Sequence, residues 1–230
     1  MEILYEDNHI IVVHKPQGVP SQADSSGDKD MLTMVKEYIK EKYNKPGNVF
    51  VGLVHRLDRP TGGVMVFAKN SKSAARLADQ LQSHEMDKTY FAVVNGNMQE
   101  NNGRLVNYLK KDEKLNKVAI VPQFEEGAKK ADLSYTVLAR NENLSLVKVK
   151  LHTGRGHQIR VQFANIKHPL VGDNKYGKAE KVMLNLYAVE LAFLHPTTKQ
   201  KMVFRVYPPE QGNAWNKFNL ETYLKLNIVE

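Results

Sequence analysis

The densest polar cluster in the chain is the run His55–Gly63, with the sequence HRLDRPTGG, which lies between two apolar segments. Its one carboxylate, Asp58, stands between Arg56 and Arg59, and neighbouring cations favour the ionised form that a nucleophile needs. Pro60 and the two glycines indicate a backbone of fixed, tight shape, and the strand-forming run VMVFA behind them would mount it on a rigid element. A surface turn with mutually neutralising charges is the competing interpretation.

A second cluster, Leu151–Arg160, reads LHTGRGHQIR. A metal site here would use His152 and His157 with a third ligand such as Asp173, but helical ligand pairs usually stand four residues apart and these stand five apart. The alternative is that the Thr-Gly-Arg-Gly turn leads into a helix N-terminus, where N–H groups and arginines bind an anion. The bound anion could be a phosphate or the Asp58 carboxylate. For one of the two arginines a purely structural role in the loop stays open.

Two further features supply an aromatic ring and positive charge. Tyr90 begins a predicted strand, where such a ring usually packs half-buried, yet its face could also stack on a base. A basic stretch follows, and taken alone it favours a solvated surface over a phosphate track; its lysines are Lys110, Lys111, Lys114 and Lys117. Phosphate-loop, Gly-x-Ser-x-Gly and dinucleotide fingerprints are absent, so ATP-dependent, serine-hydrolase and NAD-dependent functions lose their usual support.

The elements that must position these residues are short strands and a few helices. Strands are predicted at 2–5, 9–14, 64–68, 89–94, 132–139, 144–151, 182–194 and 202–207. Helices are predicted at 31–43 with Asp30 as N-cap, at 71–81 with Ser71 as N-cap, at 157–166 and at 215–224. Because the strands come in adjacent pairs, the pattern favours one α+β domain over residues 1–230, with a mixed, mainly antiparallel sheet and flanking helices.

Charge and cysteine content limit the chemistry further. The 230 residues contain 33 Lys and Arg, 25 Asp and Glu and no cysteine, and the net charge of +8 equals that of residues 101–200 alone. Such an excess favours a polyanionic partner along that segment. Without cysteine there is no disulfide, thiolate nucleophile, zinc finger or iron–sulfur cluster, which leaves a carboxylate as nucleophile. The acidic start and the lack of a long apolar run predict a soluble cytoplasmic protein.

Taken together, the motifs resemble those of the RluA-type pseudouridine synthases. The run HRLDRPTGG is similar to the family's HRLD-x-x-[TV]-S-G motif, and TGRGHQIR, continued by HPLVGDNKYG, is similar to its TGR-T-HQIR motif. The likeness extends through IIVVHKPQGVP, KTYFAVV, KKADLSYTVL and LNLYAVELAFLHP, in the family's order, over about residues 2–207.

The resemblance implies isomerisation of uridine in structured ribosomal or transfer RNA, without cofactor or metal, at an active site in a central cleft. It makes Asp58 the nucleophile, and Tyr90 the ring that stacks on the uracil and assists proton removal from carbon 5. It makes Arg160 the ion-pair partner of Asp58, with Arg155 as the fallback. The substrate-binding residues expected are Arg56 beside the vacated stack, Leu186 as apolar floor, and Arg155, His157, Lys110, Lys111 and Lys114.

Three positions depart from the family pattern, with Gly62 in place of Ser, Gly156 in place of Thr and Tyr187 in place of His. An active, monomeric enzyme with an altered loop or substrate set is expected, without the S4-type RNA-binding module of many relatives. An RNA-binding or ribosome-assembly protein of the same fold, with chemistry secondary or lost, is the second hypothesis and is supported only by the glycines. A metal-dependent hydrolase built on His152, His157 and Asp173 is the third.

Overall fold

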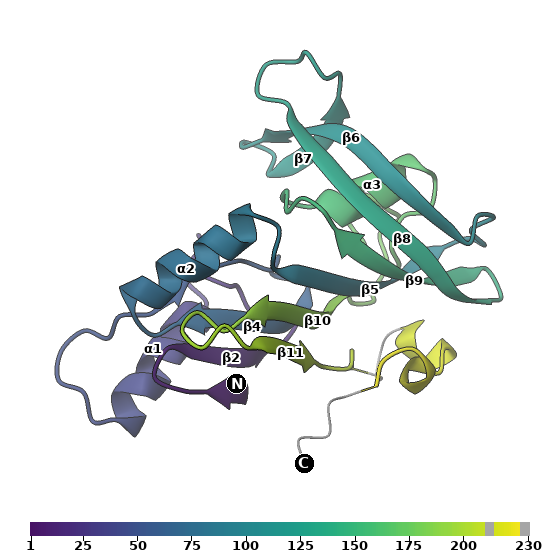
Figure 1. Cartoon of the computed structure of the whole chain (residues 1–230). Helices are drawn as coiled ribbons and strands as arrows, with labels where there is room; N and C mark the ends of the chain where they lie inside the picture. The colour runs from purple at the N-terminus through teal and green to yellow at the C-terminus, as the bar shows by residue number, and fades with distance from the viewer. Residues whose placement is uncertain (210–213, 226–230) are drawn as a thin grey trace. The chain divides into compact units, whose positions relative to one another are not determined.

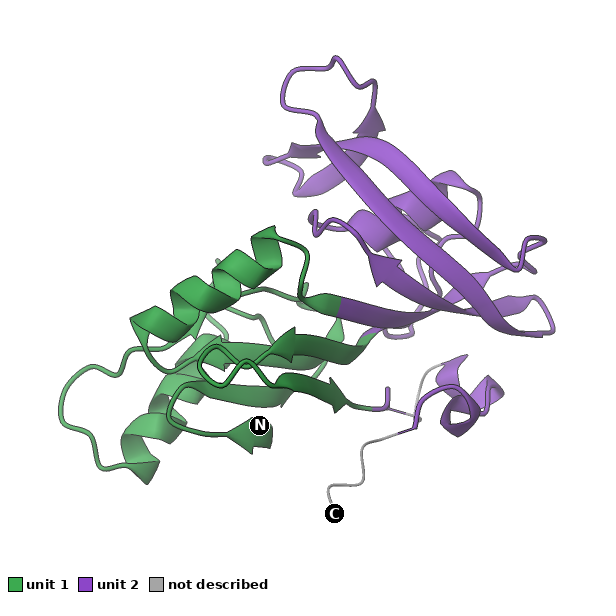
Figure 2. Ribbon diagram, in the orientation of Figure 1, with its two compact units in different colours: residues 1–87, 188–206, 226–230 green, residues 88–187, 207–225 purple. Residues whose placement is uncertain are grey.

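The computed structural model describes residues 1–209 and 214–225. Its contacts divide the chain into two compact units, which Figure 2 shows in different colours. Unit 1 contains Met1–Asp87 and Ala188–Val206, and unit 2 contains Lys88–Tyr187 and the described residues after Val206. Strands and helices mix within the units, which confirms the α+β expectation. No helix in the described ranges is long and apolar enough to span a membrane.

Unit 1 is built on an antiparallel hairpin that continues into a larger sheet (Figure 1). The strands follow the spatial order β1 (Glu2–Glu6), β2 (Ile10–Lys15), β4 (Gly62–Ala68), β10 (Leu186–Leu194) and β11 (Lys201–Arg205), and the short β3 (Gly52–Leu53) pairs with β4. Residues Ile10–Val13 and Val64–Ala68 are almost fully buried, so β2 and β4 form the centre of its core. This burial on both faces explains their unbroken apolar sequences.

Two amphipathic helices complete unit 1, and their N-caps follow the expected chemistry. Helix α1 (Met31–Lys42) begins after Asp30, whose side chain accepts a hydrogen bond from the Thr33 N–H at 3.1 Å, as predicted. The predicted cap of helix α2 (Ser71–Gln82) is Ser71, but Asn70 is the cap in the structure and accepts from the Ser73 N–H at 2.8 Å. An Asn side chain caps as well as Ser, so the boundary moves by one residue.

Unit 2 is an antiparallel sheet with one helix on one of its faces. Its spatial order is β5 (Asp87–Asn95), β9 (Leu144–Leu151), β8 (Lys129–Asn141), β6 (Asn102–Asp112) and β7 (Lys117–Val121). Helix α3 (Gln158–Asn165) packs on this sheet: the Phe163 ring lies 5.5 Å from that of Tyr135, and Val161 joins a buried cluster with Leu109, Val118 and Ala131. The sheet and α3 thus form the core of unit 2.

Two parts of unit 2 differ from the sequence prediction. The prediction contains no strand over Asn102–Leu109, the part of β6 before the basic stretch, although its alternating burial is that of a half-exposed strand. In place of the single helix predicted at 215–224, there are two short 3-10 helices, Ala214–Lys217 and Leu220–Thr222. Asn216 and Asn219 are weak helix formers, and the buried Trp215 and Leu220 fix the segment by packing instead.

Candidate active site

The segment that carries Asp58 is held by the ammonium group of Lys15. Lys15 ends β2, and its side chain is fully buried. Its Nζ donates to the carbonyl oxygens of Pro16, Arg59 and Thr61 at 3.1, 3.2 and 2.7 Å. The Thr61 N–H in turn donates to the Asp58 carbonyl oxygen at 2.9 Å. The backbone after Asp58 is therefore a tight, fixed turn, as the proline and glycines of the motif predict.

Other residues before and after the turn add to this support. Gln17 Nε2 donates to the Pro60 carbonyl oxygen at 2.8 Å, and Ser21 Oγ both donates to the Leu57 carbonyl and accepts from the Leu57 N–H. Gly63, the last residue of the motif, has φ = 132°, and a Cβ there would lie 2.2 Å from the Ala188 carbonyl oxygen. Only glycine fits this position, because β4 and β10 approach closely at it.

The two arginines that flank Asp58 have different environments. Arg59 pairs with Asp24 at 3.0 Å and with Asp28 at 2.6 Å, so two carboxylates of the preceding loop already engage its charge. Arg56 is exposed and forms no hydrogen bond or ion pair with any described residue. The Arg59 guanidinium therefore also holds the preceding loop against the turn.

Lys15 is also an electrostatic neighbour of Asp58, and the sequence reasoning missed it. Burial lowers the pKa of the Lys15 ammonium from its ordinary value to about 7, the nearby Asp58 carboxylate opposes this shift, and Arg59 adds to it. The Lys15 ammonium and the Asp58 carboxylate are thus close enough for their charges to interact. The sequence feature that could have identified Lys15 is its position directly after the apolar run IIVVH and directly before a proline.

We expect Lys15→Met to remove a pH-dependent part of the stability. The pKa of the Lys15 ammonium is about 7 in the folded protein, against an ordinary value of 10.5. Between these two values the unfolded chain binds more protons than the folded protein, so the free energy of unfolding rises with pH. Urea titrations should show this rise in the wild type and a smaller one in Lys15→Met. Lys36→Met, exposed on α1, is the matched control. If the free energy of unfolding of Lys15→Met rises with pH as steeply as that of the wild type, Lys15 is not the buried group that titrates.

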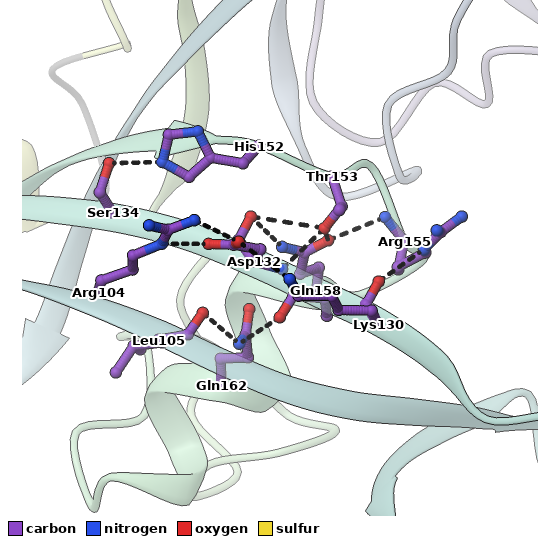
Figure 3. A network of polar contacts seen from close by, with 11 residues as sticks. Arg104, Leu105, Lys130, Asp132, Ser134, His152, Thr153, Arg155, Gln158 and Gln162 are labelled. Carbon is purple, nitrogen blue, oxygen red and sulfur yellow. Dashed lines mark hydrogen bonds and ion pairs between the residues drawn. The ribbon is translucent and has the colours of Figure 1, made fainter. Parts of the chain in front are cut away.

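The Thr-Gly-Arg-Gly turn of unit 2 is organised by the side chain of Gln158 (Figure 3). Gln158 Oε1 accepts from Thr153 Oγ1 at 2.8 Å and from the Arg155 N–H at 3.0 Å, while Nε2 donates to the Asp132 carbonyl at 3.1 Å. Arg155 Nε donates to the Lys130 carbonyl oxygen at 3.0 Å, and its side chain is otherwise exposed. The turn leads into α3 as predicted, and it presents Arg155 to solvent.

Arg160, on α3, forms a buried bidentate ion pair with Asp173. Its Nε and one terminal nitrogen lie 2.8 and 2.7 Å from the two carboxylate oxygens, and both side chains are almost fully buried. Asp173 also accepts from the N–H groups of Lys175 and Tyr176. Burial alone would raise the pKa of Asp173, but the Arg160 guanidinium and these N–H groups hold it below its ordinary value. The Tyr176 ring lies 5.2 Å from the guanidinium, as in a cation–π contact.

The ion pair on α3 involves three residues that the sequence analysis named, Arg160, Asp173 and His157. The expected pairing of Arg160 with Asp58 stays a prediction, and Asp173 is an additional partner that the sequence reasoning had considered only as a metal ligand. His157 has a left-handed backbone, with φ = 53°, and its Nδ1 lies 2.6 Å from the Tyr176 hydroxyl. His157 is thereby tied to the ring that covers Arg160.

Tyr90 lies in β5 and is mostly buried. It is opposite Val149, which is opposite Tyr135, so the three side chains share one face of the sheet. Tyr135 packs against Phe163, which shows that this is the face covered by α3. Tyr90 therefore lies on the same side of unit 2 as the helix that carries Arg160. Leu186, the first residue of β10, is buried in the same unit.

The lysines predicted to bind substrate lie at the β6–β7 hairpin but do not share one face. Lys110 pairs with Glu125 at 2.8 Å, and Lys111 pairs with Glu113. Side chains alternate along β6, so Lys110 and Lys111 point to opposite faces, and Lys114 lies in the exposed turn.

The residues of the metal-hydrolase hypothesis have other partners. His152 Nε2 lies 3.1 Å from Ser134 Oγ, His157 contacts Tyr176, and Asp173 holds Arg160. Within the described ranges, no three His, Cys, Asp or Glu side chains are grouped so as to hold one metal ion. At Gly156, one of the family departures, a Cβ would meet no atom within 4 Å, so no steric reason requires glycine there.

Comparison with known proteins identifies the family. Residues 9–165 match the family model described as RNA pseudouridylate synthase. An uncharacterized RNA pseudouridine synthase of Aquifex aeolicus is 38% identical, over 91% of this chain and 70% of its own length. The tRNA pseudouridine synthase C of Vibrio cholerae is 35% identical, over 89% and 90%. The ribosomal large subunit pseudouridine synthase D of Zymomonas mobilis is 31% identical, over 91% and 70%.

A solved structure agrees with the fold. The human RNA pseudouridylate synthase domain containing 4 superimposes with a TM-score of 0.75 at 22% identity, covering 90% of this chain and 88% of that one. The fold, the match to the family model and the identity to relatives over most of their length all point the same way. The chain belongs to the RNA pseudouridylate synthase family and is an RNA pseudouridine synthase.

Proposed function

We propose that this protein converts specific uridines of ribosomal or transfer RNA to pseudouridine with Asp58 as the attacking group. In this reaction Asp58 bonds to the nucleoside, the bond between N1 of the uracil and C1′ of the ribose breaks, the base turns, and C5 bonds to C1′. The bond to Asp58 then breaks again, the C5 proton leaves and N1 gains a proton. The observation that carries the assignment is the rigid turn after Asp58, fixed by the Lys15 ammonium. The tRNA and large-subunit enzymes among the relatives support the two substrate classes.

The remaining residues supply what base extrusion requires. A stacked base cannot turn over, so it must leave the helix, at a cost of a few kcal/mol that stacking and phosphate contacts offset. We assign the stacking ring to Tyr90, the apolar floor to Leu186, and occupation of the vacated stack to Arg56, which is exposed and without an intramolecular partner among the described residues. Arg155, His157, Lys110, Lys111 and Lys114 complete the substrate-binding set.

We assign Arg160 the role of ion-pair partner of Asp58, and a guanidinium of fixed orientation suits this role. The bidentate contact with Asp173 and the Tyr176 ring set its orientation before substrate binds. A preoriented cation keeps the nucleophile ionised after water has been excluded, without reorganisation during the reaction. We place this activity in the cytoplasm, in a single polypeptide that needs no cofactor and no metal.

Tritium release tests the proposed function. Total ribosomal and transfer RNA, labelled with tritium at uridine C5 and taken from cells that lack the gene, would be incubated with the protein with and without a chelator. We expect release that the chelator leaves unchanged. Release that stops on chelation would favour the metal-hydrolase hypothesis. RNA binding without release from either RNA would favour the RNA-binding hypothesis, which no comparison supports.

Mapping then names the substrate. Pseudouridines would be mapped in total RNA from cells with and without the gene, and the positions that disappear are the targets. We expect them in ribosomal RNA, in transfer RNA or in both. Unchanged maps in both RNAs would overturn the proposed substrate classes.

A further inference from the structure

The net positive charge of the protein is carried by unit 2. The segments Met1–Asp87 and Ala188–Val206 of unit 1 contain 14 Lys and Arg against 13 Asp and Glu, and are nearly neutral. The segment Lys88–Tyr187 contains 17 against 9, an excess equal to the net charge of the whole chain. A polyanion is therefore attracted to unit 2 rather than to the protein at large.

Strand register places much of this charge on one side of the sheet. Arg104 lies opposite Ser134, which lies opposite Lys150, and Thr136 lies opposite Lys148. Directly opposed residues share a face, and alternate residues of a strand share it too. We call this side the open face, and its cations are Arg104, Lys110, Lys130, Lys148 and Lys150.

The part of the open face that carries the lysines is exposed to solvent, in contrast to the side covered by α3. Along β9 the residues Val147 and Val149 are fully buried on the α3 side, whereas Lys148 and Lys150 between and after them are exposed. Val106 of β6 is 47% exposed on the open face. The side chains of Lys148, Lys150 and Val106 are therefore accessible to a large ligand, whereas Leu146, which alternation also places on this face of β9, is buried.

Carboxylates balance only part of the charge on the open face. Alternation places two acidic side chains among the cations, Asp112 at the end of β6 and Asp132 of β8. The two oxygens of Asp132 accept from Arg104 at 2.8 and 2.7 Å. Its distance to Lys130 Nζ is 3.9 Å, and Glu125 reaches Lys110 from outside the sheet. Lys148 has no carboxylate partner among the described residues. A net positive surface remains across three adjacent strands.

The open face is continuous with the Thr-Gly-Arg-Gly turn (Figure 3). Arg155 Nε donates to the Lys130 carbonyl oxygen, and Thr153 Oγ1 accepts from the Asp132 N–H at 2.8 Å. His152 lies on the open face itself, because its ring contacts Ser134 Oγ. The substrate-binding turn and the cations of the sheet thus belong to one structural network.

We propose that the open face binds the sugar–phosphate backbone of the RNA substrate outside the nucleotide that is isomerised. The proposal rests on the proposed function and extends it to Lys130, Lys148 and Lys150, which the proposed function does not use. Lysines on a sheet surface suit phosphates without reading base edges, so this contact supplies affinity and register rather than base specificity. An RNA that passes Arg155 would continue over Lys130, Lys150 and Lys148.

The test compares two variants with the same change of net charge. Lys130→Gln/Lys148→Gln/Lys150→Gln alters the open face, and Lys36→Gln/Lys40→Gln/Lys72→Gln alters exposed lysines of α1 and α2 in unit 1. Dissociation constants for full-length ribosomal or transfer RNA would be measured by filter binding at several salt concentrations. Each lost phosphate contact lowers the slope of log Kd against log salt by about 0.7 to 0.9.

We expect the open-face variant to lose about two units of this slope and to bind about tenfold more weakly at moderate salt, with the unit 1 variant unchanged. Equal slopes in the two variants would overturn the proposal. An unchanged slope for RNA together with lost binding of polyglutamate would overturn it in favour of an acidic protein partner. Because binding is measured without turnover, failure of the proposed function would show separately as absent tritium release.

Discussion

Asp58→Asn protein is expected to bind RNA like the wild type and to release almost no tritium from uridine C5. The fall in kcat should be about a thousandfold or more, or roughly 4 kcal/mol of transition-state stabilisation. The amide is nearly isosteric with the carboxylate but is not a nucleophile. The contacts that shape the turn run to backbone carbonyls of Arg59, Pro60 and Thr61, so the substitution leaves the anchors in place.

Asp24→Asn is the matched control for this experiment. Asp24 is a carboxylate near the same turn, but its partner is Arg59. Its replacement should weaken one exposed ion pair and change kcat by less than about threefold. Substantial turnover by Asp58→Asn, or an equal loss in both variants, would show that the reacting carboxylate is another residue.

The sequence was sufficient for features that depend on local chemistry. The buried strands β2 and β4, the Asp30 cap and the turn into α3 all follow from residues within one short segment. The family motifs supplied the candidate nucleophile in the same way. The β6 strand was missed because Val106 and Tyr108 stand on its outer face and Gly103 and Asn107 on its inner face, so its sequence shows no clear alternation of apolar and polar residues.

Contacts between distant segments could not be predicted. Lys15 holds carbonyl oxygens 44 and 46 residues further along the chain, and no local pattern links a strand-end lysine to a turn so far away. Arg59 flanks Asp58 in the motif, yet its partner Asp24 lies 35 residues earlier in the chain. The grouping of cations on the open face depends on the β6–β8–β9 register, which long connections leave undetermined in the sequence.

Arg160→Ala is the second variant with a large expected effect, and it should act on both stability and catalysis. The Asp173 carboxylate is fully buried, and without the guanidinium its charge is uncompensated. Removing one partner of such a pair typically lowers the free energy of unfolding by about 3 to 5 kcal/mol. A loss of turnover in this variant alone would therefore not separate catalysis from folding.

The double variant Arg160→Ala/Asp173→Asn separates the two effects. The amide that replaces the Asp173 carboxylate is neutral, and its oxygen can still accept from the N–H groups of Lys175 and Tyr176, which now bind that carboxylate. The uncompensated charge is gone and the turn keeps its acceptor, so most of the lost stability should return. Thermal unfolding of the wild type, the single variant and the double variant measures this directly.

Catalysis should not return with stability. If Arg160 keeps Asp58 ionised in the reacting complex, kcat should stay about a hundredfold below the wild type in both variants, or roughly 2.7 kcal/mol, while RNA affinity changes little. Turnover that returns in the double variant would make Arg160 a structural residue only. Equal losses of kcat and RNA affinity would instead place its guanidinium on the RNA rather than on the nucleophile. The ratio of these two losses, measured in a protein of restored stability, is therefore what decides the role of Arg160.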